Sequence, residues 1–176
     1  TSSLAVETRT IGVGGPSTWD DHGVQTYAFS NGTPFTSTGD IAGSLVDLTA
    51  APGDGGPDGT VYRSGGESEI GVAGGRSGAQ IDVSGGASEA LVFDFGTEVS
   101  SASVSLAAMG GNDDGSWVAY RADGSYLGSE SFDDNDSPLL INEGEPFQYL
   151  VFIGNQSNDD YQIDDITYQV GDSGQD

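Results

Sequence analysis

Acidic side chains are the residues of this chain most able to do chemistry, and they occur in clusters. The sequence holds 28 Asp and Glu, four Arg, one His, and no Lys or Cys. Neighbouring carboxylates repel one another until a cation bridges them, and hard oxygen ligands without thiolates select calcium ahead of zinc or copper. The composition therefore predicts calcium as a cofactor. The same carboxylates would also keep a surface hydrated in salty surroundings, and the two interpretations are compatible.

Most of the acidic clusters lie in expected loops, where Asp is favoured because it bonds to nearby backbone. The loop holding Asp54 and Asp58 has Gly65 where an EF-hand requires Glu. The stretch "GGNDDG" lacks one glycine and the tandem copies of a calcium β-roll. Asp113 and Asp114 of that stretch are still expected metal ligands. The other loop clusters are Asp20-Asp21, Asp133-Asp134 with Asp136, and Asp159-Asp160.

The doublet Asp164-Asp165 differs because it interrupts the apolar strand "YQIDDITYQV". For Ile163 and Ile166 both to face the core, a β-bulge must lie between them. Even without a bulge one carboxylate faces inward, and a buried carboxylate needs a partner. We expect either a calcium ion, shared with Glu7 of the N-terminal strand, or hydrogen bonds from backbone amides.

The glycine-rich stretch "GVAGGRSGAQIDVSGGASEALVFDFG" places Arg76, one of the four positive charges, between glycine pairs. Glycines let the backbone turn with positive φ and let a ligand approach closely. Arg76 can then donate to a carboxylate of a ligand or of the chain itself. Asp82 and Glu89, on flanking strands, are expected to hold an ion beside it. Pairing of Arg76 with ordinary surface acid is an equal alternative.

A catalytic site is not expected. His22 is the only histidine, and although Asp20 and Asp21 could orient it, "GRSG" does not complete a nucleophile elbow. Pairs of carboxylates for glycoside hydrolysis are too numerous to single out one. We therefore predict a protein that is not an enzyme and has no catalytic residues.

The net charge of -24 restricts the partners. It would repel nucleic acid and anionic lipid, so neither nucleic acid nor direct membrane contact is expected. No apolar run approaches the roughly 18 residues of a membrane helix. The first ten residues lack the basic and apolar regions of a signal peptide.

The elements that would position these residues are strands with alternating apolar side chains. "EALVFDF" and "VSSASVSLAAM" each present one apolar face, and "FQYLVFI" is apolar on both faces, with Phe147 expected to share a face with Tyr149. Short strands about ten residues apart, separated by Gly and Asp, predict an antiparallel, jelly-roll-like β-sandwich with long Gly/Asp-rich loops. Residues 1–176 are expected to form a single domain, with residues 12–59 mostly loop.

A hairpin is expected in "SWVAYRADGSYLGSESF". Asp123-Gly124 would form its two-residue type I′ turn. That turn would place Arg121 opposite Tyr126, and Tyr120 opposite Leu127.

The stretch from "GVAGGRSGAQIDVSGGASEALVFDFG" through "SWVAYRADGSYLG" to "PFQYLVFIG…YQIDDI" resembles a module of bacterial RTX adhesins. The most similar module is their calcium-dependent peptide-binding domain, and the resemblance spans roughly Tyr62 to Val170. It implies a secreted, cell-surface binding module with calcium in the fold and at the ligand site, where calcium can take the free carboxylate of a ligand. Similar glycine-rich segments occur in other bacterial surface domains, some of which bind sugars.

Three functions remain open. The first is an adhesin module, expected to be a monomer, that binds C-termini of peptides or proteins on a host or neighbouring cell through calcium. The second is a calcium-dependent carbohydrate-binding module, with aromatic rings stacking on glycans. The third is a spacer of the adhesin stalk, which the long loops disfavour. The aromatic residues for sugar stacking would be Trp19, Trp117, Tyr120 and Tyr126. The candidate ligand-binding residues are Arg76, Ser77, Gln80, Trp117 and Tyr126.

Overall fold

The strands of the protein are antiparallel and form a sandwich, which confirms the predicted all-β class. The computed structural model describes residues 6–30, 59–64, 68–75, 77–84 and 87–171. The elements in chain order are β1 (Glu7–Ile11), η1 (Pro16–Gly23, a 3-10 helix), β2 (Gln25–Phe29), β3 (Thr60–Arg63), β4 (Ile70–Ala73), β5 (Ile81–Ser84), β6 (Ala87–Ser88), β7 (Ala90–Ala107), β8 (Asp114–Tyr120), β9 (Tyr126–Asp133), η2 (Asp134–Asp136, a 3-10 helix), β10 (Leu139–Ile141), β11 (Phe147–Gly154) and β12 (Asp160–Val170).

Strand β7 belongs to both layers of the sandwich. Its 18 residues join the two segments that the sequence predicts as separate strands, and Gly96, with φ of 71°, lies between them. Before Gly96, β7 pairs with β2 and β11; after it, β7 pairs with β10 and β12, and with β11 only at Val99. A positive φ is readily adopted only by glycine, so Gly96 lets one strand change partners without a break.

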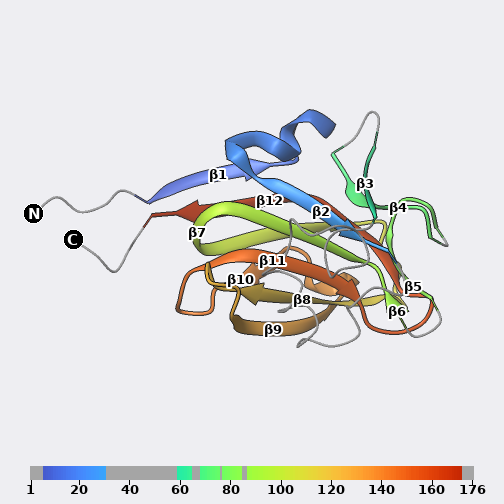
Figure 1. The fold of residues 1–176 in the computed structure, drawn as a ribbon. Helices are drawn as coiled ribbons and strands as arrows, with labels where there is room; N and C mark the ends of the chain where they lie inside the picture. Colours follow the sequence, from blue (N-terminus) through green and yellow to red (C-terminus); the bar gives the residue numbers. More distant parts are fainter. Residues whose placement is uncertain (1–5, 31–58, 65–67, 76, 85–86, 172–176) are drawn as a thin grey trace, which may run out of the picture.

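The two layers follow from these pairings. One layer runs β2–β7–β11–β8–β9, and the other contains β10, β7 and β12, with β1, β4 and β5 along the far side of β12. Strands β5 and β6 lie at the right-hand end of the sandwich in Figure 1, opposite the start of β1 and the end of β12. In the described part of the chain no helix is long and apolar enough to cross a membrane.

The main core fills the space between the layers, and a second apolar cluster lies on the opposite face of the β2–β7–β11–β8–β9 layer. Strand β11 contributes to both, as its sequence predicts. A bulge between Phe147 and Tyr149, however, turns Phe147 to the face of Leu150 and Phe152, so its predicted pairing with Tyr149 on one face is wrong. The bulge adds one residue, which inverts the alternation.

The β8–β9 hairpin has a longer turn than predicted. The Arg121 amide donates to the Ser125 carbonyl at 2.9 Å, and Tyr120 lies opposite Tyr126. Only Gly124 has positive φ, at 85°, whereas a type I′ turn needs two such residues. The predicted type I′ turn and its register are therefore wrong. A three-residue loop with Gly124 in the left-handed position replaces them.

Residues 12–59 are less irregular than predicted where the structure describes them. Helix η1 buries Trp19 completely, and β2 pairs along β7 from Gln25 to Phe29. The sequence "QTYAF" has the alternation of a strand, but it is short and follows a polar loop. Asp54 and Asp58 lie outside the described residues.

Candidate functional site

Asp82 and Glu89 form a buried pair of carboxylates at the β5–β6 end of the sandwich. Asp82 is on β5, and Glu89 is the single residue between β6 and β7; they are 0% and 1% exposed. The Asp82 amide donates to Glu89 Oε1 at 2.9 Å, and the Glu89 amide donates to the Asp82 carbonyl at 2.8 Å. The second bond continues the antiparallel pairing of β5 with β6, whereas the first goes to the Glu89 side chain. The structure thus brings together two of the predicted metal ligands.

A glycine-rich turn covers this pair. Both the amide and the hydroxyl of Ser77 donate to Asp82 Oδ2 at 2.8 Å, and the Ser77 hydroxyl also accepts from the Gln80 amide at 3.1 Å. A Cβ at Gly75 would lie 2.7 Å from Glu89 Oε2 and 3.2 Å from Asp82 Oδ2. Gly75 and Ser77 are themselves exposed, so this turn is the outer wall of the carboxylate pair.

Gly75→Ala should be more destabilising than Gly78→Ala. Both glycines have positive φ, 66° and 80°, but a Cβ at Gly78 would meet no atom within 4 Å. The shared backbone strain is about 1–2 kcal/mol, and the contact with the carboxylates adds about 1–3 kcal/mol at Gly75 alone. Urea unfolding of both variants measures the difference. Equal losses of stability would show that the carboxylates do not approach Gly75 closely.

Burial governs the ionisation of Glu89 in this pair. Burial raises the pKa of Glu89 to about 7, an effect opposed by the Asp82 amide and reinforced by the Asp82 carboxylate. Arg76 lies outside the described residues. The ion pairs of the other three arginines are Arg9–Glu7 at 2.7 Å, Arg63–Asp20 at 2.8 Å and Arg121–Glu145 at 3.1 Å.

The oxygen atoms around the pair suit a hard cation. Asp82 and Glu89 offer carboxylates and Ser77 a hydroxyl, which are ligands of the kind that calcium prefers. Nowhere in the described ranges do three or more His, Asp or Glu side chains converge closely enough to hold a metal ion. A calcium ion here would therefore need oxygens from the backbone or from a ligand in addition to the two carboxylates.

The other predicted metal ligands do not join this pair. Asp113 closes a turn by accepting from the Gly110 amide at 2.8 Å, and its second oxygen accepts from the Asp160 amide at 3.4 Å. Asp114 begins β8 opposite Asp133. The structure does not group Asp113 and Asp114 with Asp82 and Glu89, because Asp113 closes a turn and Asp114 begins a strand.

The predicted bulge at Asp164-Asp165 is confirmed. The register with β7 shifts between Ile163 and Asp165, and both Ile163 and Ile166 are fully buried. Asp164 accepts a hydrogen bond from the Ser68 hydroxyl at 2.8 Å. Burial, followed by repulsion from Asp164, raises the pKa of Asp165.

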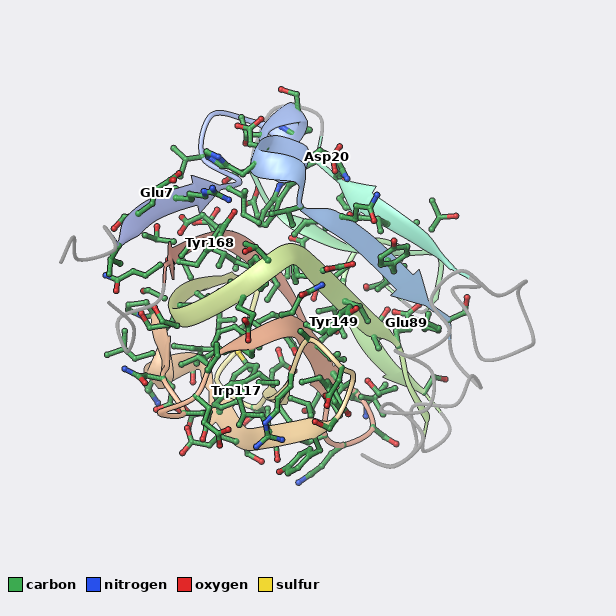
Figure 2. The ribbon with its side chains drawn as sticks, turned by 60° about the vertical axis from the view of Figure 1, so that its left-hand side comes forward. Glu7, Asp20, Glu89, Trp117, Tyr149 and Tyr168 are labelled. Atoms are coloured by element: carbon green, nitrogen blue, oxygen red, sulfur yellow. The ribbon has the colours of Figure 1, made fainter. Side chains whose placement is uncertain are left out.

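Glu7 is not the partner of this doublet. It lies opposite Val170 and bonds to Arg9 at 2.7 Å, whereas Ile11, four residues further along β1, lies opposite Ile166. The antiparallel register therefore carries Glu7 away from Asp164 and Asp165. Figure 2 shows Glu7 and Glu89 at opposite sides of the molecule.

The predicted ligand-binding residues are split between different places. Ser77 and Gln80 belong to the turn beside Asp82. Trp117 is 2% exposed and packs in the main core, between the ribbons of Figure 2. Tyr126 lies opposite Tyr120, at the turn end of the β8–β9 hairpin. Gly115 is near the other end of β8, and its distance from Tyr120 is about 17 Å at 3.3 Å per residue of extended strand. The structure therefore does not bring Trp117 and Tyr126 to the turn that holds Ser77 and Gln80.

Most of the aromatic rings predicted to stack on a sugar are inaccessible in the structure. Trp19 and Tyr120 are fully buried, and Trp117 nearly so. Trp19 and Trp117 pack in the main core, and Tyr120 packs in the second apolar cluster. Tyr126, at 47% exposed, is the one of the four that remains accessible.

Comparison of the chain with protein-family models, with curated proteins and with solved structures finds no match. The site is therefore defined by its own geometry. Gly75 was missed from the sequence, although the pair Gly74-Gly75 signals a close approach of the backbone.

Proposed function

We propose that this protein is a non-catalytic, calcium-dependent binding module that captures the free C-terminal carboxylate of a peptide. The resemblance to the peptide-binding domain of RTX adhesins supports this function and a place at the bacterial cell surface. The observation that carries the proposal is the buried pair Asp82 and Glu89 beneath an exposed glycine turn.

A bound cation would stabilise two carboxylates that lie this close together. Two buried carboxylates side by side are unfavourable when both are ionised. Protonation of Glu89, whose pKa is about 7, would relieve this at lower pH. At neutral pH and above, a bound calcium would relieve it better, because the ion attracts both charges.

A ligand carboxylate would complete the coordination of the ion. Calcium takes six to eight oxygens, and Asp82, Glu89 and the Ser77 hydroxyl supply only some of them. The exposed glycines of the turn lack side chains that would block an approaching ligand. A peptide ending in a free carboxylate offers two oxygens and a negative charge, which fits a partly coordinated calcium.

The peptide hypothesis is favoured over the sugar hypothesis because three of the four candidate stacking rings are buried. A sugar site usually needs an exposed aromatic face, and Tyr126 is not near the carboxylate pair.

Calorimetric titration with a library-selected short peptide, as free acid and as C-terminal amide, tests the proposal. A charge-assisted contact contributes about 1.5–3 kcal/mol, so amidation should weaken binding by at least about tenfold. Chelation of calcium should weaken the free acid to a similar or greater extent. Equal affinity for acid and amide would contradict carboxylate capture, and glycan binding without peptide binding would favour the sugar function.

A further inference from the structure

A groove of about 430 Å³ opens on the side of the sandwich between β9 and the segment from η2 to β10. It shares no residue with the Asp82–Glu89 site. Among the described strands, β9 pairs only with β8 and β10 only with β7, so the groove runs between two free strand edges.

The groove has an apolar floor and an apolar rim. Trp117 and Leu139 lie at its base, 2% and 5% exposed. Leu140, the next residue, is 76% exposed, which is the largest exposure among the large apolar side chains of the described residues. An exposed apolar side chain beside a groove is a surface that a partner protein can bury on binding.

Two carboxylates give the groove a negative charge. Glu130 lies opposite Trp117 in the β8–β9 pairing, and Asp136 lies across the groove on η2. Glu130 has no hydrogen-bond or ion-pair partner within the described part of the chain. The described arginines, Arg9, Arg63 and Arg121, are paired with other acids.

We propose that this groove binds an arginine or lysine side chain carried on an extended segment of a partner protein. The apolar stem of that side chain would lie along Leu140, and its charged end would reach Glu130. The free edge of β9 offers backbone hydrogen bonds to the extended segment beside it. The proposal goes beyond carboxylate capture, because its ligand is a cation and needs no calcium.

A capped heptapeptide of alternating valine and threonine with one central arginine is the probe, since its acetylated and amidated ends carry no free carboxylate. The matched probe has citrulline, a neutral isostere, in place of arginine. Calorimetry with chelator present should show about threefold to tenfold weaker binding of the citrulline peptide. The Trp117 indole N–H signal in ¹⁵N-edited spectra should shift with the arginine peptide.

Variants assign the contact to the groove. Glu130→Gln should weaken the arginine peptide by about threefold to fivefold, as expected of an exposed ion pair, and Leu140→Ser should weaken both peptides. Glu98→Gln, an equal change of charge at an exposed residue of β7, should have no effect. Equal affinity for arginine and citrulline, equal effects of Glu130→Gln and Glu98→Gln, or no binding at millimolar peptide would each overturn the proposal. A Glu130 that merely protects the edge of β9 from pairing would give that last result.

Discussion

Chelation of calcium should lower the melting temperature of this protein by about 8–16 °C. An ion present at 1,000 times its dissociation constant stabilises the folded state by about 4.1 kcal/mol. For a chain of 176 residues, each kcal/mol corresponds to about 2–4 °C. Differential scanning calorimetry at moderate, constant salt, with calcium and then with excess chelator, measures the shift. Constant salt is needed because the net charge of -24 makes stability depend on ionic strength as well.

Asp82→Asn is the variant that assigns this shift to the proposed site. The amide oxygen can still accept from Ser77, so the turn keeps a hydrogen-bond acceptor while the site loses one charge. We expect chelation to change the melting temperature of Asp82→Asn by no more than a few degrees. Asp134→Asn, an equal change at an exposed residue of η2, should retain the full shift. A wild-type melting curve unchanged by chelator would contradict a structural calcium ion.

Glu89→Gln should remove a pH dependence of stability in chelator. Burial raises the pKa of Glu89 from 4.5 to about 7, so the folded state binds a proton that the unfolded state has lost between these values. Wild-type stability therefore falls through this range as pH rises. The advantage of Glu89→Gln over wild type should grow by at most about 2–3 kcal/mol between pH 5 and pH 8.

Urea unfolding at pH 5, 6, 7 and 8 measures this difference, with Glu98→Gln as the control for a general loss of charge. The control should show a small and nearly constant difference from wild type, because Glu98 is exposed. A pH-independent difference between Glu89→Gln and wild type would show that Glu89 is ionised normally in the folded protein.

Local alternation in the sequence was enough to predict the longer strands and one of their irregularities. Ile163 and Ile166 are three residues apart, which a regular pleat cannot place on one face, and the bulge between them follows from that spacing alone. The closeness of Asp82 and Glu89 could also be predicted, because β5 and β6 are near in the sequence and pair with each other.

Register and burial could not be predicted in the same way. The place of Glu7 depends on how β1 slides along β12, and its own residues do not fix that register. Trp117 and Trp19 are as suitable for a sugar platform as for a core, and only the packing of the second layer decides between the two. The turn after Tyr120 depends on a bulge in the flanking strands rather than on Asp123-Gly124 alone.

The central claim is that calcium at Asp82 and Glu89 and the carboxylate of a peptide bind together. The most direct measurement is the affinity of one free-acid peptide at a series of free calcium concentrations, in wild type and in Asp82→Asn. Because coupling between two ligands is reciprocal, the peptide should also raise the affinity for calcium by the same factor. The account predicts at least about tenfold tighter peptide binding at saturating calcium in wild type and little change in Asp82→Asn. Peptide affinity that is independent of calcium in wild type, or equally dependent on it in Asp82→Asn, would contradict the account.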